Sequence, residues 1–198
     1  MKTYSPRLEQ ALRTAFRLHE GQRRKSDPTL PYTTHLVHVA CIVAAHDFDE
    51  DVIIAALLHD SIEDTAYTAE ELAADFGDEV YRIVMEVTEN KALRWEARKS
   101  AYIEGVRGAS PQGKAVCCAD KIHNLSSILE AERQQGEALW GVFSRGRDRT
   151  LRFYEDVLDA IAHGWSHPML EVYRAVVHKS RGRAAAPGNH NNESKHQL

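Results

Sequence analysis

The chain has 198 residues, of which 43% are hydrophobic and 27% charged, and its formal net charge is −4. This length and apolar content suffice for one domain with a sizeable core. The acidic balance gives no general attraction to nucleic acid or to an anionic membrane, so an anionic ligand needs a local cluster of cations. No stretch reaches about 18 apolar residues, and the N-terminus lacks the apolar run of a secretory signal. The three cysteines, an odd number, favour reduced thiols. We therefore expect a cytoplasmic protein that binds neither nucleic acid nor membrane.

Helix signals follow one another along the chain. Ser5-Pro6 predicts a helix start and Gly21 its end, and after a basic loop Thr33 or Thr34 caps the next helix. Apolar spacing and capping residues predict further helices over 53–64, 69–76, 80–87, 95–103, 111–128, 151–161 and 169–177. No segment alternates convincingly as a strand does. The predicted fold class is all-α, a bundle of roughly eight to ten helices.

The predicted domain spans residues 1–180. The remaining segment, 181–198, has too few apolar residues to pack against a core, and we expect it to be a disordered tail. His190 and His196 lie in this tail and are not expected to be ligands.

The stretch from Ile53 to Asp64 stands out because an apolar run ends in one histidine and three carboxylates. Burying carboxylates costs several kcal/mol each, and a helix C-terminus opposes their charge. On one helix, His59, Asp60, Glu63 and Asp64 fall within an arc of about 140° and can border one pocket. A divalent metal bound by His59 and Asp60 explains the pattern. The alternative is a surface pair at a fraying helix end, with the other two carboxylates solvated.

Two further positions offer metal-binding groups. His35 falls in the first turn of a predicted helix, where the helix dipole favours the neutral imidazole that a metal needs, although His38 competes with it. Asp120 lies on a mostly apolar helix, where a buried salt bridge is the alternative. With His59 and Asp60, these residues supply two imidazoles and two carboxylates from three helices. This set suits a divalent ion such as Mn²⁺, with positions left for water and substrate.

The basic loop, residues 22–32, carries three consecutive cations and then Ser26. Such a loop can hold phosphate, and Tyr32 offers a surface for stacking. An ordinary solvated basic turn is the alternative.

The order His…His-Asp…Asp resembles that of the HD superfamily of metal-dependent phosphohydrolases. Three segments, 24–26, 55–65 and 119–125, are similar to the hydrolase domain of the RelA/SpoT family, whose members remove the 3′-pyrophosphate from the alarmone (p)ppGpp. The likeness runs from about residue 5 to about residue 163 and leaves no room for the synthetase or regulatory domains of long members. The chain thus resembles a free-standing small alarmone hydrolase.

The resemblance implies a role for each matching residue. His35, His59, Asp60 and Asp120 would bind Mn²⁺, and Glu63 and Asp64 would orient and deprotonate the attacking water. Substrate contacts are implied as follows: Arg24 and Lys25 flank the base; Ser26, Asn124 and Ser127 hydrogen-bond base or ribose; Arg98, Lys99 and Arg149 neutralise the diphosphates; and Tyr154 or Phe153 closes the pocket.

Two positions depart from the family pattern. Leu36 stands where relatives have proline after the first ligand, and Trp95 stands where many have a basic residue. The base, guanine or adenine, stays open because stacking does not distinguish purines. The ligands would also accept Fe²⁺, Co²⁺, Zn²⁺ or Mg²⁺. The alternatives are an HD phosphatase acting on another nucleotide such as NADPH, and a non-catalytic alarmone-binding protein. The sequence does not define the oligomeric state.

Overall fold

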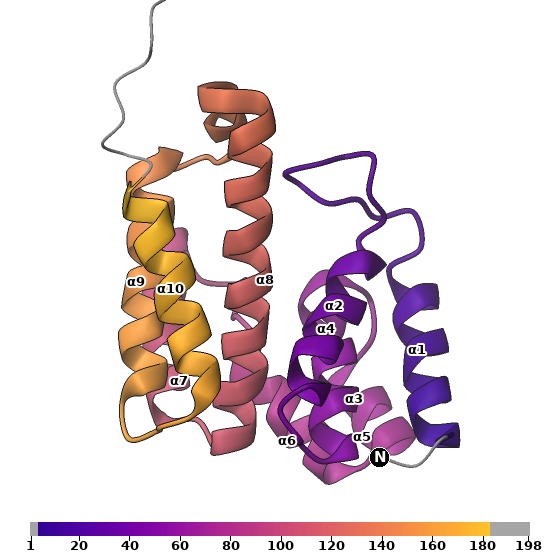
Figure 1. The fold of residues 1–198 in the computed structure, drawn as a ribbon. Coiled ribbons are helices and arrows are strands. Elements are labelled where there is room, and N and C mark those ends of the chain that lie inside the picture. The colour runs from indigo at the N-terminus through magenta and orange to yellow at the C-terminus, as the bar shows by residue number, and fades with distance from the viewer. Residues whose placement is uncertain (1–3, 183–198) are drawn as a thin grey trace, which may run out of the picture.

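The computed structural model describes residues 4–182 and is built from helices (Figure 1). Within this range no strand is present, only an isolated bridge between Arg23 and Pro31. The elements are α1 (Pro6–Leu18), α2 (Thr33–Ala44), α3 (Glu50–Leu58), α4 (Ser61–Asp64), α5 (Ala69–Phe76), α6 (Asp78–Val87), α7 (Trp95–Gly108), α8 (Pro111–Gln135), the 3₁₀ helix η1 (Gly136–Val142), α9 (Gly146–Ala162) and α10 (Pro168–Gly182). The predicted all-α class is confirmed.

Capping residues place several helix starts where the sequence predicts them. The Ser5 hydroxyl accepts a hydrogen bond from the amide of Leu8 at the start of α1. Thr68 and Glu71 form a reciprocal capping box at the start of α5, and Ser110 caps α8. These side chains satisfy amides that have no partner within the helix.

The predicted helix over 53–64 is broken in the structure. The apolar part belongs to α3, all of whose residues from Val52 to Leu58 are buried. The helix is interrupted at His59 and Asp60, and the single turn α4 follows. At the other end of the chain, α10 extends beyond the expected Val177 to Gly182, and the Arg181 guanidinium lies 2.7 Å from the Glu155 carboxylate. Of the predicted tail, residues 183–198 lie outside the described residues.

The long helix α8 lies between two groups of helices (Figure 1). It contacts α2, α3 and α6 on one side and α7, α9 and α10 on the other. The loop between α1 and α2 lies beside its C-terminal half (Figure 1). The site residues on α8 therefore face groups from both halves of the chain. No helix among residues 4–182 has the length and apolar character needed to cross a membrane.

Candidate active site

Four ligand atoms converge at the centre of the molecule. His59 Nε2 lies 3.0 Å from Asp60 Oδ2 and 3.3 Å from His35 Nε2. His35 Nε2 lies 3.3 Å from Asp120 Oδ1 and 3.6 Å from Asp60 Oδ2. Within the described part of the chain, His35, His59 and Asp120 also form a group of metal-binding side chains whose ligand atoms all lie within 4.8 Å of one another. The four predicted ligands are therefore brought together.

Three helices, and the short non-helical step between α3 and α4, place these groups. His35 is in the first turn of α2, and Asp120 is in the middle of α8. His59 ends α3, and Asp60 lies in the break before α4, so adjacent residues both turn toward the same point. All four side chains are buried or nearly so, with Asp60 the most exposed at 17%. The side chains of these two neighbours reach the same pocket, with His59 Nε2 3.0 Å from Asp60 Oδ2.

The ligand atoms fit a divalent ion. Ligands about 2.1 Å from an ion and at right angles are separated by about 3.0 Å, close to the separations seen here. The Nδ1 of His59 lies 2.8 Å from the Ala56 carbonyl oxygen and must donate its proton there, which leaves Nε2 as the basic nitrogen. His35 Nδ1 lies 2.8 Å from His123 Nδ1, which can accept its proton in the same way.

The charges of the pocket also suit a cation. Burial raises the pKa of Asp60, but His59 and His35 outweigh it and hold that pKa well below its usual range. Burial also raises the pKa of Asp120. Lys121, whose Nζ lies 2.6 Å from Asp120 Oδ2, and the two histidines outweigh burial and lower this pKa well below 3.8. Burial lowers the pKa of His59, yet Asp60 and Asp120 raise it well above 6.5 overall. The carboxylates are ionised, and in the absence of metal His59 carries a proton that an ion would displace.

Two residues that support the ligands were not assigned this role from the sequence. The Tyr32 hydroxyl donates to Asp60 Oδ2 over 2.6 Å, and the Tyr32 ring stacks on that of His19. Burial and His35 lower the pKa of His123 to about 3, which keeps the ring neutral beside His35. The signal available in the sequence is spacing, because His123 lies one helical turn after Asp120.

Glu63 and Asp64 lie on α4, next to the metal ligands His59 and Asp60 in the sequence, and face residues 89–91. Glu63 Oε2 accepts a hydrogen bond of 3.1 Å from the amide of Glu89, and Asp64 accepts one from Lys91. Burial, followed by the charge of Asp60, raises the pKa of Glu63 to about 7. A carboxylate that titrates near neutrality beside a metal pocket has the properties of a general base.

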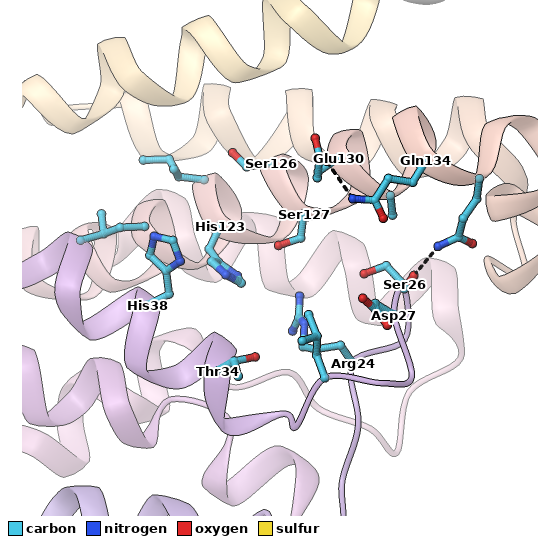
Figure 2. A pocket seen from close by; sticks show the side chains of 15 residues that line it. Arg24, Ser26, Asp27, Thr34, His38, His123, Ser126, Ser127, Glu130 and Gln134 are labelled. Carbon is cyan, nitrogen blue, oxygen red and sulfur yellow. Dashed lines mark hydrogen bonds between the residues drawn. The ribbon is translucent and has the colours of Figure 1, made fainter.

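The implied substrate residues border two separate spaces. Arg24, Ser26 and Ser127 line a cavity of about 500 Å³ between the α1–α2 loop and α8, where Arg24 and Ser127 face each other (Figure 2). Asn124 lies beside it, and its Oδ1 accepts a hydrogen bond of 2.6 Å from Arg24 Nη2. The same Asn124 donates to Asp120, so a hydrogen-bonded chain links this cavity to the metal pocket.

The second space is a cleft of about 190 Å³, lined by Lys25, Trp95, Lys99, Phe143, Ser144, Arg145, Thr150, Phe153 and Tyr154. Both aromatic residues proposed to close the pocket, Phe153 and Tyr154, border this cleft. Arg98 lies outside its lining and pairs with Glu89 at 3.0 Å. Arg149 is 64% exposed and lines a shallow outer hollow that also includes Trp95 and Lys99. The lining of this cleft therefore includes Lys25, Lys99 and Tyr154, but not Arg98, which shares Glu89 with Lys99, or Arg149.

The replacement of proline by Leu36 leaves the metal pocket intact. Leu36 is fully buried in the hydrophobic core. The first turn of α2 forms from Thr33 without a side-chain cap, and His35 keeps its place.

Comparison with known proteins gives consistent matches. Residues 11–143 match the HD domain family model. The guanosine-3′,5′-bis(diphosphate) 3′-pyrophosphohydrolase MESH1 of Drosophila melanogaster is 39% identical over 131 residues, which cover 65% of this chain and 73% of that protein. The 3′-pyrophosphohydrolase of Haemophilus influenzae is 46% identical over 116 residues, but these are only 17% of that longer protein.

Solved structures agree with the sequence matches. A metazoan orthologue of SpoT, described as hydrolysing ppGpp, superposes with a TM-score of 0.80 at 31% identity and covers 92% of this chain and 99% of its own. A Listeria monocytogenes protein superposes with a TM-score of 0.69 at 36% identity, over 76% of this chain and 97% of its own. The chain belongs to the HD-domain family and, within it, to the RelA/SpoT-type branch that contains the MESH1 proteins.

Proposed function

We propose that this protein is a metal-dependent pyrophosphohydrolase that removes the 3′-pyrophosphate from (p)ppGpp-like alarmones, giving GDP or GTP, or the adenine equivalents, and pyrophosphate. The observation that carries the proposal is the convergence of four ligand atoms beside a carboxylate with a pKa of about 7, in a chain of this family. Relatives in the same branch are named for this reaction.

His35, His59, Asp60 and Asp120 would hold one divalent ion, which we assign as Mn²⁺ from the family resemblance. When bound, such an ion lowers the pKa of water and stabilises charge on phosphoryl oxygens. Glu63 then takes the proton of the attacking water, and Asp64 orients that water. The new bond joins the water oxygen to the phosphorus that carries the 3′-oxygen. The bond from this phosphorus to the 3′-oxygen breaks with its electron pair on the oxygen, which takes up a proton from solvent, so the nucleotide leaves with a 3′-hydroxyl.

We propose, from the family resemblance, that Arg24 and Lys25 flank the base. Arg24 borders the larger cavity, whereas Lys25 Nζ lies in the cleft, 5.1 Å from the centre of the Phe143 ring. We propose that Ser26, Asn124 and Ser127 hydrogen-bond the base or ribose. Lys99, Arg98 and Arg149 are proposed to neutralise the diphosphates, and Tyr154 to close the pocket.

Product analysis tests this function. The protein is incubated with Mn²⁺ and, in separate reactions, with ppGpp, ppApp and NADPH, and the products are resolved by anion-exchange chromatography beside a chelator control. We expect GDP or ADP together with intact pyrophosphate, and no product with the chelator. Absence of turnover of both alarmones while the protein binds Mn²⁺ would contradict the proposal. Release of orthophosphate from NADPH alone would instead assign the chain as a phosphatase of another nucleotide.

A further inference from the structure

Three cations line the 190 Å³ cleft, and each lies over an aromatic ring. Lys25 Nζ is 5.1 Å from the centre of the Phe143 ring, and Lys99 Nζ is 4.4 Å from that of Phe153. The guanidinium carbon of Arg145 is 5.2 Å from the Trp95 ring. Cation–π contacts of this kind hold the cations against the aromatic rings. Lys99 is also paired with the buried Glu89 at 2.5 Å and Arg145 with the exposed Glu96 at 3.2 Å, so two of the three cations have a carboxylate partner and that of Arg145 is the more exposed one.

Arg145 was not among the residues implied by the family resemblance. It directly precedes α9, and its guanidinium lies over the ring of Trp95, a position at which the family resemblance implies a basic residue. Arg149, which the resemblance does imply, is one turn further along and lies outside the lining of the cleft. At position 95 the ring of Trp95 thus lies under the guanidinium of Arg145.

The partner of Arg145 in this structure is easily exchanged. Its Nη2 lies 3.2 Å from Glu96 Oε1, and the two side chains are 39% and 61% exposed. Exposed pairs of this kind contribute about 0–1 kcal/mol. A phosphate group accepts two parallel hydrogen bonds from a guanidinium and carries more charge than one carboxylate. A phosphorylated ligand in the cleft should therefore displace Glu96 from Arg145.

We infer that Arg145 is a substrate-binding residue for a phosphate group of the alarmone, and that it supplies positive charge beside Trp95 from the position just before α9. This inference rests on the proposed function, because it assigns a phosphate contact in the same active site. Glu96 acts as a competitor that holds the guanidinium over the Trp95 ring until a phosphate replaces it.

Steady-state kinetics of charge variants test the inference. Arg145→Met keeps the alkyl packing on Trp95 but removes the charge, and we expect KM for ppGpp to rise about tenfold with kcat changed less than about twofold. Arg145→Lys should recover most of the affinity. In the Arg145→Met background, Trp95→Lys should return KM to within about threefold of the wild-type value. A KM unchanged in Arg145→Met, or raised equally in Arg145→Lys, would overturn the inference.

Glu96→Gln gives a prediction of opposite sign. It removes the competing carboxylate and should lower KM about two- to threefold, and this gain should be clearly smaller in the Arg145→Met background, where only the pair of Glu96 with Arg149, at 3.8 Å, remains to be broken. A purely structural role for Arg145 predicts the same gain in both backgrounds, so an equal gain in the two, or an unchanged KM in Glu96→Gln, contradicts the inference. The matched control is Arg174→Ala on α10, which removes another half-exposed arginine paired with a glutamate and should leave KM unchanged.

The outcome is separable from that of the proposed function. Wild-type protein that does not hydrolyse ppGpp refutes the proposed function. Wild-type protein that hydrolyses ppGpp, with Arg145 variants of unchanged KM, refutes only the role of Arg145. Thermal unfolding of each variant, compared with the wild type, identifies any rise in KM that comes from misfolding.

Discussion

The metal pocket and the cationic cleft are built in different ways. Each ligand in the pocket is buried or nearly so, and most are fixed by a second contact: His59 by the Ala56 carbonyl, Asp60 by Tyr32 and Asp120 by Lys121. In the cleft, Lys25 and Arg145 are exposed and rest on aromatic rings. The pocket is therefore preorganised for chemistry, whereas the cleft can adjust to its ligand. Substitutions in the pocket should change kcat and metal binding, and those in the cleft should change KM.

The largest effect is expected from Asp120→Asn. This substitution removes the charge of one ligand and leaves Lys121, whose side chain is 10% exposed, without its carboxylate. We expect loss of metal binding, a fall in activity of at least about 10³-fold, and destabilisation of about 3–5 kcal/mol. Metal content by mass spectrometry, hydrolysis rate and thermal unfolding measure these changes. Asp159→Asn, at an exposed position of α9, is the control and should match the wild type. Retained metal and activity in Asp120→Asn would remove it from the ligand set.

A large effect on the chemical step alone is expected from Glu63→Gln. The amide keeps the size of the side chain and can still accept from the Glu89 amide, but it cannot take a proton from water. We expect kcat to fall about 10²–10⁴-fold while Mn²⁺ affinity stays within a few-fold of the wild type. Single-turnover rates and calorimetric titration with Mn²⁺ distinguish the two quantities. Unchanged hydrolysis with the metal bound would exclude Glu63 as the base.

Tyr32→Phe should weaken metal binding without touching a ligand. The variant removes the hydroxyl that donates to Asp60 Oδ2 over 2.6 Å and keeps the ring. Loss of a hydrogen bond to a metal ligand typically costs about 10–100-fold in metal affinity. Tyr67→Phe is the control, since its hydroxyl also bonds a carboxylate, that of Asp75, away from the pocket. Equal Mn²⁺ affinities for Tyr32→Phe and the wild type would show that the pocket does not depend on this support.

Metal binding should release protons. In the metal-free protein, Asp60 and Asp120 hold the pKa of His59 well above its usual value against the effect of burial, and burial raises the pKa of Glu63 to about 7. A bound cation disfavours both protonated forms, so Mn²⁺ affinity should rise with pH, by up to about tenfold per pH unit for each proton displaced. Calorimetry in two buffers of different ionisation enthalpy counts the protons. The same heat in both buffers near pH 7 would contradict this expectation.

The smallest effect is expected at the cleft. Lys25→Ala removes an exposed cation that lies over the Phe143 ring, and KM for ppGpp should rise about three- to fivefold. Neither kcat nor Mn²⁺ affinity should change, because Lys25 contacts no ligand of the metal pocket. A fall in kcat larger than the rise in KM would show that the cleft takes part in the chemical step.

Much of the fold follows from local signals in the sequence. Ser5-Pro6, Thr68 and Ser110-Pro111 mark helix starts because they satisfy free backbone amides, and the structure has helices there. The break at His59 and Asp60 was missed, since an apolar run with no proline or glycine reads as one continuous helix. Both residues keep αR backbone angles, so no residue type at these positions marks the interruption.

In the site, too, some residues were predictable from the sequence and others depend on the packing of helices. Carboxylates in apolar segments marked Asp60 and Asp120, because buried charge needs a partner of opposite sign. The support from Tyr32 and the place of Arg145 in the cleft depend on how α2, α7 and α9 pack, and no short motif encodes that. Trp95 was recognised as a departure from the family, but its contact with Arg145 appears only in three dimensions.

Isotope labelling tests the central claim most directly, that the metal pocket activates water to attack the phosphorus joined to the 3′-oxygen. Hydrolysis of ppGpp in H₂¹⁸O with Mn²⁺ is followed by ³¹P NMR and mass spectrometry of both products. We predict one ¹⁸O atom in the pyrophosphate and none in GDP. Label in the 3′-hydroxyl of GDP, or in released orthophosphate, would contradict this account.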